Sequence, residues 1–164
     1  MRDTIRALTP DDATLYRALR LEALRAHPEA FGASFEEEAA QNDSFFVARL
    51  TANTVFGGFD ASGLAGTAGF RPESGGKQAH KALFWGMYVR PAARGSGLSR
   101  RLVEAVLAHA RGRVELIQLK VVATNTPARH LYESLGFEVY GIEARSLKVD
   151  GRYHDEVLMV KSPP

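Results

Sequence analysis

The chain has 164 residues and contains no cysteine. This absence excludes a disulfide framework, a metal site with thiolate ligands and an acyl-enzyme formed on a cysteine. A chain without cysteine also fits a reducing compartment, so the sequence predicts a cytoplasmic protein.

Long apolar runs and blocks of basic residues are missing as well. No segment approaches the roughly 18 apolar residues of a membrane span, and MRDTIRALTPDD at the start lacks the apolar centre of a signal peptide. Lysine and arginine together number 21 against 19 acidic residues, without the basic block that tracks phosphates along a duplex. We therefore expect neither a membrane nor a nucleic-acid partner. The mild positive charge suits a small anionic ligand, or it belongs to an ordinary solvated surface.

The length predicts a single domain over residues 1–164, large enough to bury a core of its own. Near the start, a strand is expected at TIRAL, followed by a helix from Asp11 to Ala26 on which Leu15, Leu19 and Leu24 recur at helical spacing. The dipeptide His27-Pro28 ends this helix, because the residue before proline is pushed out of the helical region.

Capping-box spacing in the segment Ser34 to Glu37 predicts a second, shorter helix, and SFFVARL adds one or two further helical turns. Six strands are expected later in the chain: two in TVFGGFDASGLAGTAGFRP, one each in KALFWGMYV and VELIQLKVVAT, and two that form a hairpin around 137–148 and 153–161. Helices are expected near 97–111 and from Thr126 to Gly136. This order predicts an α/β fold with a mixed sheet, antiparallel early and parallel where a helix crosses over.

The turn RPAARGSGLSRRL places Gly95 and Gly97 between a strand and a helix. A P-loop is excluded because Gly-Lys-Ser/Thr does not follow. A dinucleotide fingerprint fails because Arg100 stands where the third glycine would let helix and strand pack closely. What remains is a helix N-terminus with unpaired N–H groups and arginines around it, which is a suitable anion site. The alternative is a glycine-rich turn that only reverses the chain.

A second motif follows in VVATNTPARHLYESLGF, where Asn125 precedes a helix and Tyr132 lies two turns inside it. By itself Tyr132 is equally consistent with an aromatic residue at the edge of the core. Together with the glycine turn, however, Asn125-x-x-Ala128-x-x-Leu131-Tyr132-x-x-x-Gly136-Phe137 resembles the GNAT superfamily of acetyl-CoA-dependent N-acyltransferases. The resemblance is strongest from about residue 83 to residue 139.

The phosphate loop of that superfamily reads Arg/Gln-x-x-Gly-x-Gly/Ala, and Arg94, Gly97 and Ser99 match it, with serine as a small departure. The resemblance implies an α/β (α+β) fold with a mixed, mainly antiparallel sheet of about seven strands, splayed at the cofactor site and flanked by helices on both faces. It also implies acetyl-CoA as acyl donor, no metal, and direct attack by an amine without an acyl-enzyme. Homodimers are common among such proteins, so a homodimer is a possible assembly.

The resemblance assigns a role to each part of the site. Backbone groups of the strand before the loop would pair with the pantetheine arm and stabilise the developing oxyanion. The loop amides would hold the pyrophosphate, and Tyr132 would be the general acid that protonates the departing thiolate. The implied cofactor-binding residues are Met87, Tyr88, Val89, Arg94, Gly95, Ser96, Gly97, Leu98, Ser99, Asn125, Ala128 and Tyr132.

No general base can be named from the sequence, because residues 82–89 contain neither a carboxylate nor a histidine. The run Glu36–Glu38 could serve directly or through water, but a solvated first-turn cluster, favoured by the helix dipole, is the better explanation. Glu143, His80 and His154 are further candidates, each also readable as a surface or structural residue.

The resemblance implies that PEAFGASFEEE and ARSLKVDGRYHDEVLM form the walls of the acceptor pocket, the latter like the C-terminal hairpin of GNAT branches that acetylate small amines. The charges of these segments favour two different kinds of acceptor. Glu36–Glu38, Asp150 and Asp155 favour a cationic acceptor, whereas Arg145 and Arg152 favour one that bears a carboxylate. We expect the primary amine of a small molecule, such as an amino acid or a polyamine. A protein N-terminus or lysine is the alternative, and a non-catalytic acyl-CoA-binding domain is a further one that would not need Tyr132.

Overall fold

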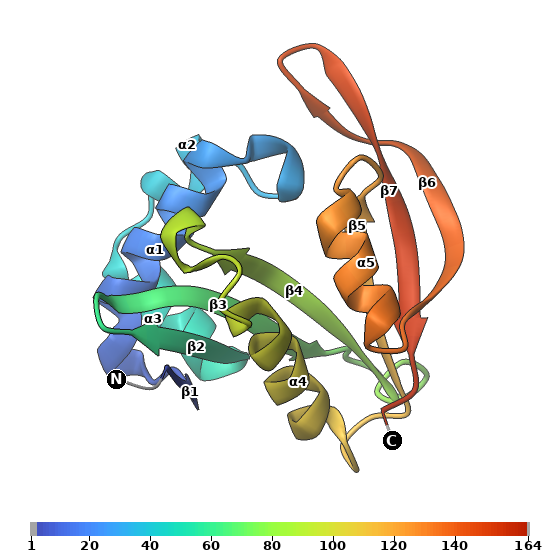
Figure 1. Cartoon of the computed structure of the whole chain (residues 1–164), viewed down its shortest axis with the longest axis horizontal. Coiled ribbons are helices and arrows are strands. Elements are labelled where there is room, and N and C mark those ends of the chain that lie inside the picture. The colour runs from blue at the N-terminus through green and yellow to red at the C-terminus, as the bar shows by residue number, and fades with distance from the viewer. Residues whose placement is uncertain (1–2, 164) are drawn as a thin grey trace.

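One mixed sheet of seven strands, in the order β1-β2-β3-β4-β5-β7-β6, organises the molecule in the computed structural model, which describes residues 3–163 (Figure 1). Only β4 and β5 run parallel, and every other neighbouring pair is antiparallel. The predicted fold class is therefore confirmed. The strands are β1 (Thr4–Ala7), β2 (Thr54–Asp60), β3 (Gly63–Pro72), β4 (Lys81–Val89), β5 (Leu116–Val122), β6 (Glu138–Val149) and β7 (Arg152–Lys161).

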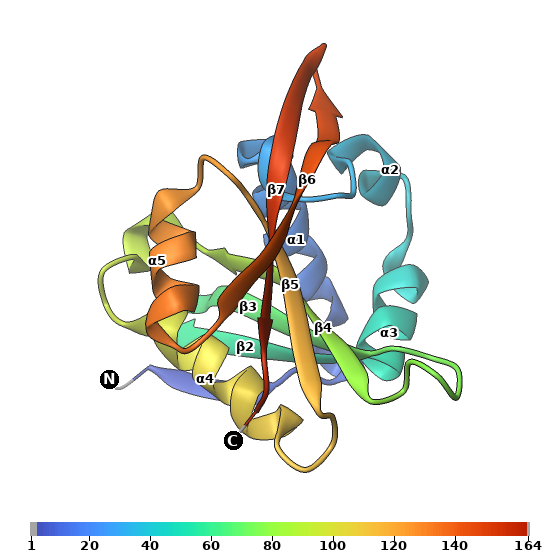
Figure 2. The ribbon, with the colours of Figure 1, turned by 90° about the vertical axis from the view of Figure 1, so that its right-hand side faces the viewer.

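Helices cover both faces of the sheet, with α1 and α3 on one side and α4 and α5 on the other (Figure 2). Each face has its own buried cluster, so the sheet is the middle layer of three. The α-helices are α1 (Ala13–Ala26), α2 (Phe35–Ala39), α3 (Asp43–Ala52), α4 (Leu98–Ala110) and α5 (Thr126–Ser134). Short 3₁₀ turns are η1 (Pro10–Asp12), η2 (Pro28–Ala30) and η3 (Pro91–Ala93).

The first helix departs from the prediction in two details. It begins at Ala13 rather than Asp11, because Pro10–Asp12 form the 3₁₀ turn η1. Leu15, predicted to face the core, is 53% exposed, while Tyr16 is buried against Phe46. Leu19 and Leu24 are buried as predicted, so the predicted stripe is wrong only at its first position.

The third helix is longer than SFFVARL alone predicts. It spans ten residues, Asp43–Ala52, and begins where the side chain of Asn42 accepts a hydrogen bond from the Phe45 amide. An asparagine at this position satisfies an otherwise unpaired N–H group and fixes the start of the helix. Within residues 3–163, no helix combines the length and apolarity that a bilayer crossing requires.

The sheet opens between its two parallel strands. The ladder between β4 and β5 contains only the pairs from Lys81–Leu116 to Leu83–Gln118, and beyond them the strands separate (Figure 1). β4 continues to pair with β3 on its other side as far as Val89. From Phe84 onward, the edge of β4 that faces β5 therefore has no partner strand.

A bulge interrupts β4 within this open stretch. The β3–β4 register shifts between Thr67 and Gly69, opposite Gly86, which has a φ of +65°. The Thr67 hydroxyl donates to the Gly86 carbonyl over 3.2 Å and holds the irregular strand against β3. A bulge of this kind redirects the backbone next to a site.

The hairpin of β6 and β7 extends past the rest of the sheet, as Figures 1 and 2 show at the top of each view. Asp150 and Gly151 at its tip have φ values of +48° and +78°. Two consecutive left-handed residues are the requirement of a tight type I′ turn, so the predicted Asp-Gly turn is confirmed.

Candidate active site

A cavity of about 640 Å³ lies where β4 and β5 separate. Its walls come from the segment around η2, the open end of β4, the start of α4, the end of β5 and the first turns of α5. The predicted site residues that line it are Met87, Tyr88, Val89, Arg94, Ser99, Asn125, Ala128 and Tyr132. Segments up to a hundred residues apart in the chain thus meet in one cavity.

The glycine turn lies beside this cavity and leads into α4. Gly95 and Gly97 have φ values of +79° and +85°, and a Cβ added at either would meet no atom within 4 Å. Gly97 is the N-cap of α4, so the positive end of the helix dipole faces this open space. The turn therefore has the backbone conformation and the room that a bound anion needs.

Only part of the loop backbone is available to a ligand. The Arg94 amide donates to the Pro91 carbonyl, and the Leu98 amide donates to the Ser96 hydroxyl oxygen. The Leu98 side chain is buried in the core. Among residues 3–163, no hydrogen bond uses the amides of Gly95, Ser96, Gly97 or Ser99. The predicted row of amides from Arg94 through Ser99 is thereby reduced to these four.

Arg94 closes one end of the cavity. Its Nε donates to the Val89 carbonyl over 3.1 Å, and its Nη2 lies 3.3 Å from Nε2 of His27. Because a guanidinium only donates, this contact assigns the lone pair to His27 Nε2 and the proton to Nδ1. Nδ1 in turn lies 4.0 Å from a carboxylate oxygen of Glu29. Arg94 thus links the His27 ring to the end of β4 at the cavity wall.

Glu29, Ala30 and Phe31 line the cavity, as expected for part of the wall predicted in PEAFGASFEEE, whereas residues 32–38 do not line it. His27 also lines the cavity but precedes that segment, and its only sequence signal is the helix break at His27-Pro28. The structure brings this loop opposite β4, where it forms the other side of the opening.

Tyr132 is both a buried aromatic residue of the core and a part of the cavity lining. Its ring packs edge-on against Phe84 and Phe137, with centroid separations of 5.6 and 5.9 Å, and only 5% of the residue is exposed. It also lines the cavity. Burial raises the pKa of Tyr132 above that of an ordinary phenol. The hydroxyl group therefore keeps its proton throughout the neutral range.

Asn125 and Ala128 begin the helix that carries Tyr132. The Asn125 side chain caps α5 by accepting a hydrogen bond from the Ala128 amide over 3.3 Å. Pro127 follows within the first turn, where its missing N–H group leaves nothing unpaired. The cap thus fixes the wall of the cavity opposite β4.

The candidate bases suggested by the sequence do not line the cavity. His80 immediately precedes β4, at the end of the strand opposite the cavity, and His154 lies within the hairpin. Glu143 binds Ser146 and Lys120, and these hydrogen bonds lower the pKa of its carboxyl group. A carboxylate held in this way is a weak base.

The charged hairpin residues expected to bias the acceptor also lie outside the cavity lining. Asp155 accepts a hydrogen bond from the backbone amide of Arg145, which stabilises a bulge in β6 where Arg145 has a φ of +52°. Asp150 and Arg152 belong to the exposed tip. None of these four charged side chains lines the cavity, and neither does any other residue of the predicted wall ARSLKVDGRYHDEVLM.

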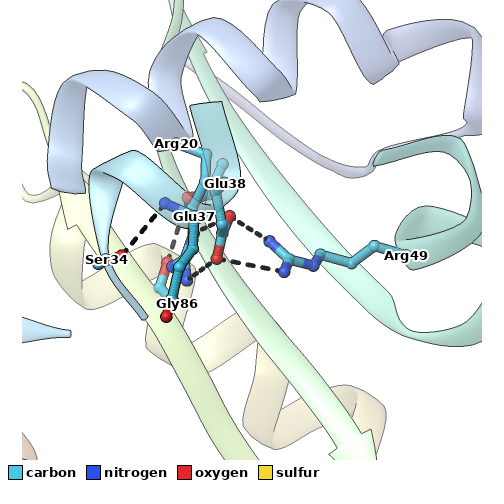
Figure 3. A network of polar contacts seen from close by, with 7 residues as sticks. Arg20, Ser34, Glu37, Glu38, Arg49 and Gly86 are labelled. Carbon is cyan, nitrogen blue, oxygen red and sulfur yellow. Dashed lines mark hydrogen bonds and ion pairs between the residues drawn. The ribbon is translucent and has the colours of Figure 1, made fainter. Parts of the chain in front are cut away.

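Glu38 is the largest departure from the predicted Glu36–Glu38 cluster, because its side chain is buried instead of solvated. Its carboxylate accepts two hydrogen bonds from Arg20, at 3.1 and 3.0 Å, and two from Arg49, at 2.8 and 3.3 Å (Figure 3). Burial alone would raise the pKa of Glu38, but the hydrogen bonds from both arginines outweigh it and lower the pKa. Glu38 is thus a structural anion and not a base.

Replacement of Glu38 by alanine should destabilise the fold by about 3–5 kcal/mol, because two arginines lose their shared buried partner. Glu37→Ala is the matched control, since the neighbouring Glu37 side chain is exposed, and it should change stability little. Urea unfolding of both variants measures the difference. Because the folded pKa of Glu38 is lowered, its contribution is complete above the carboxyl group's ordinary pKa and is lost as the pH falls below it. Equal stability of the two variants would contradict a stabilising role for the buried cluster.

The sequence profile of the Acetyltransferase (GNAT) family matches residues 13–137, which include the cavity-lining part of the chain from η2 to α5. The chain belongs to the GNAT acetyltransferase family. Its fold agrees with a GNAT acetyltransferase from Streptococcus pneumoniae at a TM-score of 0.88 and 20% identity, covering 98% of this chain and 99% of the other. A second structure, yncA from Salmonella typhimurium with its cofactor acetyl-CoA, agrees at a TM-score of 0.82 and 22% identity, covering 100% and 95%.

Among characterised GNAT relatives, the N-alpha-acetyltransferase RimI of Mycobacterium tuberculosis is 32% identical over 148 residues, which are 90% of this chain and 86% of RimI. A mycothiol acetyltransferase from Acidothermus cellulolyticus is 33% identical over 151 residues, and the match spans 45% of that longer protein. This GNAT protein is therefore an acyltransferase, and acetyl-CoA is its acetyl donor.

The residues in and beside the cavity fit the parts of acetyl-CoA. The open glycines and unused amides of the loop fit a pyrophosphate, and Arg94 adds a positive charge beside them. The partnerless edge of β4 offers backbone hydrogen bonds to an extended arm that contains amides.

Proposed function

We propose that this GNAT protein transfers the acetyl group of acetyl-CoA directly to the primary amine of a small molecule. The observation that carries the proposal is the cavity at the β4–β5 opening, where an unpaired strand edge, a loop with unused amides and Tyr132 meet. An amino acid or a similar amine is the acceptor we infer.

In this proposal, different residues of the cavity bind different parts of the donor. The amides of Gly95, Ser96, Gly97 and Ser99 hold the pyrophosphate, with Arg94 beside it. The backbone of Met87, Tyr88 and Val89 pairs with the pantetheine arm, while Asn125 and Ala128 form the other side. The donor supplies an activated thioester, whose position at the bulge of β4 brings the carbonyl group next to backbone N–H groups.

The same residues account for the reaction. A neutral amine attacks the thioester carbon, a C–N bond forms, and the C–S bond breaks. Backbone N–H groups near Met87 and Tyr88 stabilise the negative charge that develops on the carbonyl oxygen. Tyr132 donates its proton to the sulfur as it leaves. Water that reaches the open cavity takes the proton lost by the amine, so no dedicated base is required.

A protein N-terminus is the second candidate acceptor, and the likeness to RimI favours it, because the two chains match over most of their lengths. The RimI name describes an N-alpha-acetyltransferase, whose acceptor would enter the cavity as the end of a chain. The open rim between the η2 segment and β4 is compatible with either acceptor.

An acceptor screen with acetyl-CoA and a thiol-release readout separates these functions. We expect amino acids or other small amines to give the highest kcat/KM, above that of peptides with a free N-terminus or an internal lysine. Acetyl-CoA should raise the melting temperature because it binds only the folded state, whereas NAD should not. A peptide as the best acceptor would favour the second function. Stabilisation by acetyl-CoA without thiol release from any acceptor would indicate a non-catalytic binding domain.

A further inference from the structure

Arg20 uses only one edge of its guanidinium group on Glu38. Nε and Nη2 donate to the two carboxylate oxygens, and no hydrogen bond among residues 3–163 involves Nη1. The Arg20 side chain is 8% exposed. A guanidinium carries five N–H donors, and unpaired donors on a buried cation are unfavourable. The second edge is therefore available to a ligand.

Arg20 does not itself line the cavity, but its unused edge lies directly behind the wall at Gly86. Nη1 lies 3.7 Å from the position that a Cβ would occupy at Gly86, and Gly86 lines the cavity. Figure 3 shows Gly86 beside the head group of Arg20. A Cβ at this position would be in van der Waals contact with Nη1, whereas glycine leaves that place unfilled.

Two aromatic residues of the cavity wall hold the guanidinium in place. The Arg20 head group lies 5.2 Å from the ring centre of Phe31 and 5.7 Å from that of Trp85, and both rings line the cavity. Cation–π contacts from two sides and the bidentate pair with Glu38 restrict its motion. A preorganised cation of this kind loses little entropy when it binds an anion.

The charges around Arg20 leave an excess of one positive charge. Glu38 is a single carboxylate shared between Arg20 and Arg49, both of which stay protonated. In a partly buried position this excess attracts an anion more strongly than an exposed arginine would. Glu29 lines the same cavity, and a carboxylate there suits an ammonium group.

Resting on the acetyltransferase function proposed above, we propose that Nη1 of Arg20 binds the carboxylate of the acceptor, and that the acceptor is a free amino acid. The carboxylate lies against Arg20 beside Gly86, while the amine points to the thioester at the bulge of β4. Phe31, Trp85 and Met87 line the same cavity and favour an apolar side chain on this amino acid. Arg20 is thus a specificity-determining residue rather than a catalytic one.

Three acceptors that differ only at the carboxylate test the proposal: leucine, leucinamide and 3-methylbutylamine. With saturating acetyl-CoA, kcat/KM for leucine should exceed the other two by about tenfold or more, the range of a charged hydrogen bond. The amine of leucinamide is less basic, so it offers more neutral nucleophile at a given pH, and this bias works against the expected result. Arg20→Met should abolish the preference for leucine.

Arg49→Met is the matched control, because Arg49 pairs with the same carboxylate of Glu38 but does not face Gly86. It should weaken the fold in the same way and keep the preference for leucine. Arg20→Lys, which retains the positive charge opposite Glu38, serves if Arg20→Met does not fold, and it should reduce the preference as well. Equal loss in the Arg20 and Arg49 variants would overturn the proposal.

Trp85 is the only tryptophan of the chain and lies in the cavity wall, so its fluorescence reports acceptor binding without turnover. In the presence of CoA, the wild type should bind leucine about tenfold more tightly than leucinamide. Arg20→Met should bind the two with equal affinity. Equal kcat/KM and equal binding of the three acceptors would refute the carboxylate site while acetyl transfer still stood. Absent thiol release would refute the proposed function, and the binding comparison would still decide whether Arg20 holds a carboxylate.

Discussion

Tyr132→Phe should lower kcat by on the order of 10²–10⁴-fold with little change in CoA affinity. The substitution keeps the ring and therefore its edge-on contacts with Phe84 and Phe137, and removes only the hydroxyl group. Because burial raises the pKa of Tyr132, the wild-type phenol is protonated at neutral pH and can donate to the departing sulfur. Initial rates at saturating acetyl-CoA, beside a CoA titration of the same variant, measure the two effects separately.

Tyr16→Phe is a suitable control for this experiment. Tyr16 is also a buried tyrosine with a raised pKa, but it packs against Phe46 on the other face of the sheet and does not line the cavity. Its loss of a hydroxyl group should affect stability and leave kcat near the wild-type value. A turnover of Tyr132→Phe within a few-fold of wild type would remove Tyr132 from the role of general acid and leave it as a core aromatic.

Gly97→Ala should weaken CoA binding on the order of a hundredfold, because a methyl group would occupy the open space in front of the loop amides and separate them from the pyrophosphate. Alanine is preferable to proline here, since the φ of +85° at Gly97 is far from the value near −65° that proline imposes. Isothermal titration with CoA gives the affinity directly.

Gly112→Ala provides the matched comparison at the other end of α4. Gly112 has a φ of +73°, and a Cβ there also meets no atom within 4 Å, so the backbone strain of the substitution is similar. The two variants should lose comparable stability, and only Gly97→Ala should lose CoA affinity. Comparable CoA binding in both would show that the glycine turn serves the chain reversal alone.

Local signals explain why the order of elements could be predicted from the sequence. Proline and glycine mark the ends of α1, α4 and α5, and short apolar runs separated by turns mark the strands. The glycine turn and Tyr132 could also be found, because each belongs to a motif within a few residues of sequence. The resemblance implies a pocket wall in PEAFGASFEEE, but which of its residues reach the cavity could not be predicted, since this wall forms only when the chain after α1 folds back toward β4.

The buried charges were even harder to predict from the sequence than the cavity wall. Glu38 stands in a run of three glutamates that a sequence cannot distinguish, yet one helical turn places Glu36 and Glu37 in solvent and Glu38 between two arginines. Arg20 likewise lies on a helix whose pattern predicts only which side is apolar. Its long stem allows burial on that side, and its partner is 18 residues away. Pairing at such a distance depends on tertiary structure.

The short ladder between β4 and β5 also has a mechanical consequence. The ladder that joins strands β1–β4 to strands β5–β7 contains three residue pairs. The two groups of strands therefore share few backbone hydrogen bonds within the sheet. An extended ligand in the opening would supply hydrogen bonds where the ladder stops and would act as a tie between the two groups. The donor would then rigidify the enzyme that uses it, and amide protons of residues 84–89 and 120–122 would exchange more slowly with solvent in the bound state than in the free one.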